Sequence, residues 1–169
     1  MRPYLLVDVD FTLNPDFRAT WDAPEGNALR QAGWVIIQGF TFNERSVWLN
    51  VWHGRDLLRV AYETGAELAW ATNWGALANR VVSPILGLPH LPVAGTPGVS
   101  KAQAVPPWCA GRPFVWLDDD EGSDVMAACE RTPGGAGVKV NPATGLTAAN
   151  LHTARSLLAV AAGKELEAA

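Results

Sequence analysis

The sequence predicts an α/β fold in which a mainly parallel sheet is covered by helices on both faces. Short apolar runs recur along the chain, beginning with Tyr4–Val7, and they have the length of buried parallel strands. Segments with the apolar spacing of a helix separate these runs, as in residues 54–64. Such an alternation of strands and helices is typical of a parallel sheet with helices packed on either side.

Length and composition indicate one globular domain. The chain has 169 residues, of which 49% are hydrophobic and 18% charged, and its formal net charge is −4. This composition suits a folded domain with a sizeable core. We expect a single domain over residues 1–163 and a frayed tail over 164–169. A net negative charge without a block of Lys and Arg argues against binding to long nucleic acid.

Several features predict a soluble cytoplasmic protein. The chain starts with a strand-like run and has neither the charged nor the apolar region of a signal peptide. No apolar run has the length of a membrane span. Cys109 and Cys129 lack metal-type spacing and are too few for a disulfide framework, so we expect a reducing compartment and buried thiols.

A β-hairpin is predicted after the first strand. Residues 15–33 contain prolines and glycines and are expected to be irregular. Strand-like runs follow over 34–38 and 46–51, and turn-forming residues over 41–45 separate them. The two runs should therefore pair as antiparallel strands.

The two sides of this hairpin differ in character. Alternation along its second strand puts Trp48, Asn50 and Trp52 on one side and Val47, Leu49 and Val51 on the other. If the aliphatic side packs on the core, the tryptophan side faces the site or a partner subunit. Together with Trp34, these tryptophans could stack on a substrate ring or pack, and packing is the favoured interpretation.

The rest of the chain continues the alternation of strands and helices. Pro84 is expected to end a short helix over 75–82. Pro92 places the strand over 91–94 at a sheet edge. The other predicted elements are strands over 67–71, 114–117 and 137–140, helices over 54–64, 121–131 and 147–162, and a helix from Ser100 to about Pro106 that carries Lys101.

Two aspartates directly after the first strand are the first candidates for chemistry. In open α/β sheets the ligand lies beyond the carboxyl ends of the strands. Asp8 and Asp10 are therefore predicted to point into that crevice, with Val9 turned away. Carboxylates this close repel each other, so they need a cation, a shared proton or a reaction that uses both.

Later polar residues complete an ordered pattern. A threonine follows the strand over 67–71, a lysine lies in a proline-rich apolar stretch, and an acidic cluster follows the strand over 114–117. In this order, the set resembles the four motifs of the haloacid dehalogenase-like superfamily over roughly the whole chain. The motif residues are Asp8, Asp10 and Thr12, then Thr72, then Lys101, then Asp118 and Asp119.

The resemblance implies a three-layer Rossmannoid fold with a five-stranded, mainly parallel sheet. Its strands would lie in the order fifth, fourth, first, second, third, so that the first and fourth strands are neighbours and the two acidic motifs meet. The hairpin over 34–52 would be a flap above the site. The chain has no room for a large cap domain, and capless relatives act on large substrates or close their sites by forming oligomers.

The resemblance also implies a role for each motif residue. Asp8 is the expected nucleophile, and Asp10 is the expected general acid and then base. Lys101 would neutralise the phosphoryl group and hold Asp8 ionised. Thr72 would donate to a phosphoryl oxygen, and Thr12, Asn73 and Trp74 are the other expected substrate contacts. An Mg²⁺ ion, which prefers hard oxygen ligands, would be held by Asp8, the backbone carbonyl of Asp10, Asp118 and Asp119.

Two points stay open within these motifs. Asp119, Asp120 and Asp124 are all candidates for the second acidic residue of the metal site, although an acidic residue such as Asp120 also suits the start of a helix. The family often has glycine directly after the second aspartate of the first motif, whereas this chain has Phe11. That bulk would narrow the leaving-group side or stiffen the turn.

We therefore expect a Mg²⁺-dependent phosphomonoester hydrolase that acts through an aspartyl-phosphate intermediate. Its substrate would be a phosphorylated small molecule or a nucleotide, and assembly into a homo-oligomer would be one way to close the site. Two alternatives remain. A sugar acceptor in place of water gives a phosphotransferase or mutase, and a non-catalytic binding module could use the same scaffold.

Overall fold

The main sheet of the protein has four parallel strands. The computed structural model describes residues 1–38, 46–95, 98–122 and 124–163. Within them, the sheet order is β4-β1-β5-β6. The strands are β1 (Tyr4–Val7), β4 (Glu67–Trp70), β5 (Phe114–Asp118) and β6 (Gly135–Lys139). Every β1 residue is buried, as expected for an interior parallel strand.

The predicted five-stranded sheet in the order fifth, fourth, first, second, third is wrong. Residues 91–94 do not form its third strand but make a single bridge, from Val93 to Trp70. Two backbone bonds make this contact, from Trp70 N–H to the Pro92 carbonyl (2.8 Å) and from Ala94 N–H to the Trp70 carbonyl (2.6 Å). Because proline has no N–H, Pro92 cannot donate to a ladder, and the pairing does not extend.

The predicted hairpin forms a second, separate sheet. Strands β2 (Trp34–Ile37) and β3 (Val47–Asn50) pair antiparallel, with Trp34 opposite Asn50. The antiparallel pairing is therefore confirmed, while the predicted turn over 41–45 lies outside the described residues. The predicted tail over 164–169 also lies outside them.

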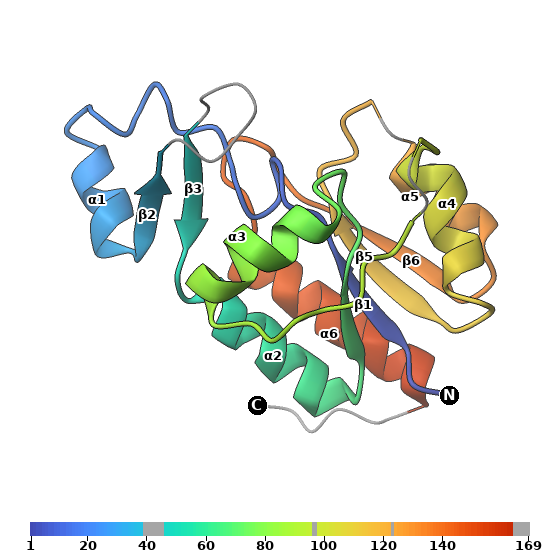
Figure 1. Ribbon diagram of the computed structural model, residues 1–169. Coiled ribbons are helices and arrows are strands. Elements are labelled where there is room, and N and C mark those ends of the chain that lie inside the picture. The colour runs from blue at the N-terminus through green and yellow to red at the C-terminus, as the bar shows by residue number, and fades with distance from the viewer. Residues whose placement is uncertain (39–45, 96–97, 123, 164–169) are drawn as a thin grey trace.

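Helices cover the main sheet on both faces (Figure 1). Helices α2 (His53–Thr64), α3 (Ala76–Leu86) and α6 (Ala148–Ala162) pack with one core cluster, and α4 (Lys101–Trp108) and α5 (Val125–Arg131) pack with another. The pleat of β1 explains the division. Leu5 and Val7 belong to the first cluster, whereas Leu6 belongs to the second.

Several element boundaries differ from the predicted ones. Helix α3 continues through Pro84 to Leu86, because Leu86 is buried in the main core and Gly87 then ends the helix with a φ of +65°. Helix α4 likewise passes its prolines and ends at Trp108. Helix α1 (Gly26–Gln31) occupies part of the segment predicted to be irregular.

The hairpin has its own aromatic cluster. On its aliphatic side, Val47 and Leu49 are buried in the main core, which meets the condition stated from the sequence. On the other side, Trp34 and Trp48 pack against two residues of the preceding segment, Phe17 and Trp21. The ring of Phe17 lies 4.8 Å from Trp34 and 6.5 Å from Trp48, in edge-on geometry. Packing, the favoured interpretation, is thus confirmed for Trp34 and Trp48, whereas Trp52, the third tryptophan of the hairpin region, is 51% exposed.

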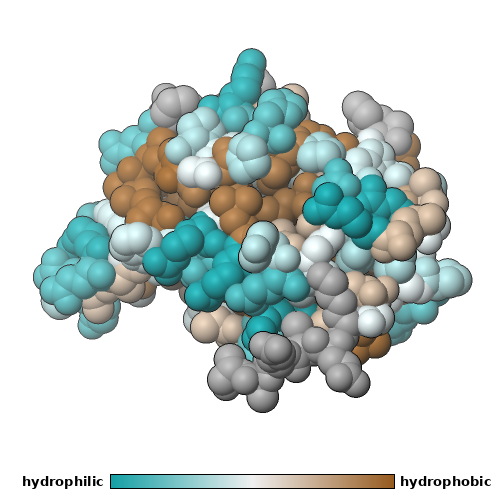
Figure 2. All heavy atoms as spheres, turned by 90° about the horizontal axis from the view of Figure 1, so that it is seen from below, coloured by the Kyte–Doolittle hydropathy of each residue, from teal (hydrophilic) through white to brown (hydrophobic). Residues whose placement is uncertain are grey.

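Some apolar side chains are exposed on the surface of the protein. Figure 2 shows a hydrophobic area in the upper part of the face seen from below, with hydrophilic residues beside it. Among the described residues, the exposed large apolar side chains are Met1, Trp52, Leu58, Tyr62, Val99 and Val160. Among the described helices, none combines the length and the apolar character that crossing a membrane requires.

Candidate active site

Three aspartates meet where β1 and β5 end. These strands are parallel neighbours, with Val7 opposite Leu117, and the N–H of Asp8 donates to the Leu117 carbonyl (3.0 Å). Asp118 is the last residue of β5, and Asp119 follows it. Carboxylate oxygens of Asp8, Asp118 and Asp119 all lie within 4.8 Å of one another, and the three residues are buried. The register of two parallel strands therefore joins residues that are far apart in the chain.

Lys101 lies between two of these aspartates. Its Nζ donates to Oδ2 of Asp8 and to Oδ2 of Asp118, both at 2.8 Å. The side chain is 11% exposed. Lys101 is also the first residue of α4, where the helix dipole disfavours a positive charge. The negative charges of Asp8 and Asp118 offset this unfavourable interaction with the helix dipole. The lysine therefore does not stabilise the helix itself, and its position is explained by the two carboxylates.

Burial and the neighbouring charges shift the pKa values of Asp8, Asp119 and Lys101. Burial raises the pKa of Asp8 to about 7, Lys101 opposes this rise, and Asp118 adds to it. Burial and Asp118 also raise the pKa of Asp119. For Lys101, burial alone would lower the pKa, but the charges of Asp8 and Asp118 prevail and raise it. The ammonium is therefore charged, while Asp8 is poorly stabilised as an anion in the absence of another cation.

The donor set fits a hard divalent cation. Three carboxyl groups share one ammonium in this group, so its formal charge would be −2 with every carboxyl group ionised. Oxygen ligands from carboxylates are those that Mg²⁺ and Ca²⁺ prefer. A bound cation would also reverse the pKa shift of Asp8, because an opposite charge favours the ionised form.

Backbone bonds orient the acidic cluster after β5. The N–H of Asp120 donates to Oδ1 of Asp118 (2.8 Å), and the N–H of Glu121 donates to Oδ2 of Asp119 (3.3 Å). Asp120 turns away, and its Oδ1 accepts from the N–H of Met126 in the first turn of α5 (3.1 Å). The structure therefore brings Asp119, rather than Asp120 or Asp124, to the other two aspartates.

The carboxylate of Asp10 is not part of the group of three. Its Oδ1 accepts from Nδ2 of Asn14 (3.1 Å), and its Oδ2 accepts from Nε1 of Trp74 (2.8 Å). The turn that follows Val9 is tight, since the Val9 carbonyl accepts from the N–H groups of Leu13 and Asn14, both at 2.9 Å. Phe11 takes a φ of +57° in this turn, a conformation that favours the glycine common in the resembled family.

The other predicted contact residues have different surroundings. Thr72 is buried beyond the end of β4, next to β1, and its Oγ1 accepts from the N–H of Trp74 (3.3 Å). Asn73 is exposed. Thr12 is fully buried, and its Oγ1 has no hydrogen-bond partner among the described residues. The Thr12 hydroxyl is therefore enclosed by the protein rather than presented to a ligand.

Two contacts of this site were not predicted from the sequence. Trp74 is expected from the sequence to contact the substrate, whereas its bond to Asp10 joins residues 64 positions apart. Asn14 is not among the residues that the sequence pattern indicates. No signal in the sequence could have identified either contact, because both depend on how the loops after β1 and β4 fold against each other.

Comparisons with known proteins bear on the fold alone. No family model and no curated protein matches the chain. Among solved structures, the crystal structure of a hypothetical protein from Xanthomonas campestris is similar, with a TM-score of 0.50 and 18% sequence identity. The match covers 96% of this chain and 84% of that chain. Similarity of fold does not specify a function, which depends on the residues of the site.

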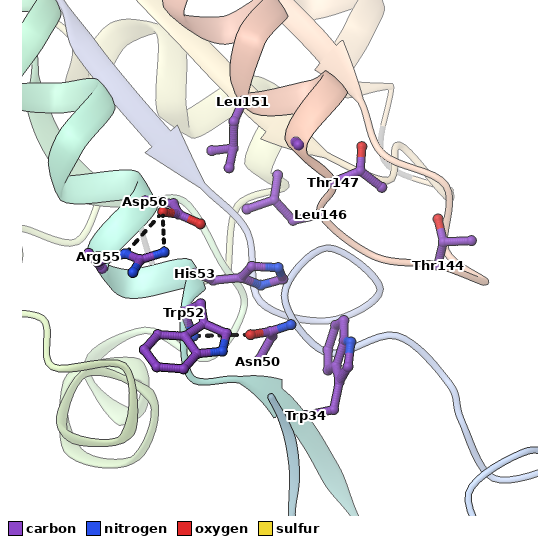
Figure 3. A pocket seen from close by; sticks show the side chains of 11 residues that line it. Trp34, Asn50, Trp52, His53, Arg55, Asp56, Thr144, Leu146, Thr147 and Leu151 are labelled. Atoms are coloured by element: carbon purple, nitrogen blue, oxygen red, sulfur yellow. Dashed lines mark hydrogen bonds and ion pairs between the residues drawn. The ribbon is translucent and has the colours of Figure 1, made fainter. Parts of the chain in front are cut away.

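A cavity of about 480 Å³ lies elsewhere, between the hairpin and the starts of α2 and α6. In Figure 3 the ring of His53 lies between Leu146 on one side and Asn50 and Trp34 on the other. Burial lowers the pKa of His53 to about 4, against the opposing effects of Asp56 and the Leu146 backbone. His53 is thus a neutral, buried residue of the wall, and no residue of the acidic group lines this cavity.

Proposed function

We propose that this protein is a Mg²⁺-dependent phosphomonoester hydrolase that acts through an aspartyl phosphate on Asp8. The observation that supports the proposal most strongly is the buried group formed by Asp8, Asp118 and Asp119 around the ammonium of Lys101. A phosphomonoester is itself anionic, so a carboxylate nucleophile can approach it only where positive charge is concentrated. Lys101 supplies part of that charge.

The order of the motifs gives independent support. The residues of this group come from three separate parts of the chain, in the order that resembles the haloacid dehalogenase-like superfamily. Thr72 follows the strand next to β1, where its hydroxyl would donate to a phosphoryl oxygen. The alternatives named from the sequence differ in acceptor or in activity, and no structural observation favours either of them.

The first step of the proposed reaction transfers the phosphoryl group to the protein. An oxygen of Asp8 attacks phosphorus, and the bond between phosphorus and the ester oxygen breaks. Asp10 gives its proton to the departing oxygen, which leaves as an alcohol. Lys101 and Thr72 hold the oxygens of the phosphoryl group during this step.

The second step releases phosphate. Asp10, now ionised, takes a proton from water, and the water oxygen attacks phosphorus of the aspartyl phosphate. The bond between phosphorus and Asp8 breaks, which restores both carboxyl groups to their starting forms. Asp8, Asp118 and Asp119 would hold Mg²⁺, which when bound supplies charge neutralisation and polarises a phosphoryl oxygen.

Hydrolysis of an aryl phosphate with and without Mg²⁺ tests this proposal. We expect turnover only with the metal, a covalent phosphate on the peptide that contains Asp8 after an acid quench, and loss of both in Asp8→Asn. Asp118→Asn should weaken Mg²⁺ binding in calorimetry. Asp22→Asn is the control, since Asp22 is an exposed carboxylate outside the group.

Two outcomes would contradict the proposal. Transfer of phosphate to an added sugar in preference to water would identify a phosphotransferase. No turnover of aryl, sugar or nucleoside monophosphates, together with no Mg²⁺ binding, would favour the non-catalytic module.

A further inference from the structure

Two side chains from different loops hold the carboxylate of Asp10, one at each oxygen. Asn14 donates to Oδ1 from the turn after β1, and Trp74 donates to Oδ2 from the loop after β4. We propose that Asn14 and Trp74 are positioning residues for Asp10, and that Asn14 ties the position of this carboxylate to the hairpin. This inference rests on the proposed function, in which Asp10 is the general acid and base.

The orientation of Asn14 follows from its two partners. Its Oδ1 accepts from the backbone N–H of Trp48 in β3 (2.8 Å), while its Nδ2 donates to Asp10. A backbone N–H can only donate, so the amide oxygen must face Trp48 and the NH₂ group must face Asp10. The carboxylate is thereby connected to the hairpin through a single side chain.

Trp74 is suited to fix the other oxygen. An indole N–H is only a donor, and its bond to Oδ2 of Asp10 is 2.8 Å long. The side chain is half-buried and packs against the main core. The N–H of its backbone donates to Oγ1 of Thr72. Because the ring is held by packing, Trp74 links the loop of the expected phosphoryl ligand Thr72 to the carboxylate of Asp10.

Two donors at opposite oxygens define the plane of a carboxylate. Rotation of the Asp10 carboxyl group would break the bond to Asn14, to Trp74 or to both. The position left free on the carboxyl group, which carries the proton in the first step and a lone pair in the second, then keeps a fixed direction. Orientation of this kind contributes strongly to proton transfer, and a displacement of about 1 Å can cost about 100-fold in rate.

The loss of rate caused by removing a positioning residue of Asp10 should depend on the leaving group of the substrate. An alkoxide leaves poorly without a proton, whereas a nitrophenolate needs the proton much less. A residue that only positions the acid therefore matters for alkyl phosphates and little for nitrophenyl phosphate. A residue that contacts the substrate itself, as the sequence suggested for Trp74, would instead change KM.

Trp74→Phe is the decisive variant because it keeps the ring and removes the N–H. We expect kcat for an alkyl phosphate to fall about 10- to 100-fold, with a change of less than about threefold for nitrophenyl phosphate and an unchanged KM. Asn14→Leu should show the same pattern. Trp108→Phe is the matched control, since Trp108 is also half-buried but packs on Tyr4 instead.

Each other outcome has a defined meaning. Equal losses on both substrates, or a raised KM, would overturn the inference and make Trp74 a substrate contact. Unchanged kinetics in Trp74→Phe, with turnover in the wild-type protein, would overturn this inference alone. No wild-type turnover would overturn the proposed function and the inference together. An indole N–H resonance of Trp74 that does not move in Asp10→Ala, which removes the acceptor, would also contradict the bond, without any need for activity.

Discussion

The ammonium of Lys101 lies 2.8 Å from Oδ2 of Asp8, although 93 residues separate the two along the chain. The same nitrogen is equally close to Asp118. Because both carboxylates are buried, each would be costly as an isolated anion, and the ammonium of Lys101 offsets part of that cost for both. The stability of the protein and the chemistry of the site therefore depend on one cation.

Lys101→Met should destabilise the metal-free protein, because it leaves two buried carboxylates without a cation. Breaking a buried pair in this way costs roughly 3–5 kcal/mol. Mg²⁺ should restore part of the loss, because it supplies positive charge to the same oxygens. Thermal melts in EDTA and in Mg²⁺ measure both effects. Lys139→Met is the control, since that side chain is 63% exposed and should change stability by less than about 0.5 kcal/mol. Equal losses with and without Mg²⁺ would contradict a cation site here.

The affinity for Mg²⁺ should fall as the pH falls below about 7. In the metal-free protein, burial first and Asp118 second raise the pKa of Asp8 to about 7, although Lys101 opposes this. Below that pH, Asp8 carries a proton that must leave before the metal binds, so affinity should drop by up to about tenfold per pH unit. Above it, the carboxylate is already ionised and affinity should level off. Calorimetric titrations between about pH 5.5 and 8 measure the profile, and a constant affinity over that range would contradict it.

Asp8→Asn provides the control for this pH dependence. The amide cannot ionise, so the variant should bind Mg²⁺ weakly with a flatter profile. A profile as steep as that of the wild-type protein would assign the titrating proton to another residue.

The acidic centre could be predicted because strand ends are visible in the sequence. Asp8 and Asp118 each follow an apolar run, and parallel neighbouring strands bring their carboxyl ends to one edge. The third strand was wrongly predicted because an apolar run such as 91–94 does not reveal how far its pairing extends. Pro92 indicated a sheet edge, but it stops the ladder after one bridge.

The surroundings of Asp10 and of the hairpin could not be predicted in the same way. The bond from Trp74 and the packing of Phe17 against Trp34 join loops whose paths depend on tertiary structure. Local patterns specify which residues alternate along a strand, but not which distant segment covers them. Helix α1 could not be predicted for a related reason. It begins shortly after Pro24 and has only six residues, which are too few to show a helical period.

His53 should make the protein less stable as the pH falls from about 6.5 to about 4. Burial lowers its folded-state pKa to about 4, so in this window the unfolded chain binds a proton that the folded protein does not. The loss should reach roughly 3 kcal/mol at the acid end. Urea denaturation at several pH values should show a flatter profile for His53→Gln. His90→Gln is the control because His90 is exposed, and the wild-type slope should remain in it.

Trp48 and Trp52 are close in sequence but should respond very differently to truncation. Trp48 is 5% exposed and packs in the aromatic cluster with Phe17, whereas Trp52 is 51% exposed. Trp48→Ala leaves a large cavity and should cost roughly 3–5 kcal/mol, with Trp48→Phe as a milder variant.

Trp52→Ala is the matched control for this comparison, and it should cost less than about 1 kcal/mol. The midpoint of urea unfolding measures the difference, and size-exclusion chromatography tests self-association in the same samples. If the tryptophan side of the hairpin met a partner subunit instead, Trp48→Ala would weaken self-association at unchanged stability. The packing of Trp48 against Phe17 makes loss of stability the expected result, because the side chain has no free face to offer a partner.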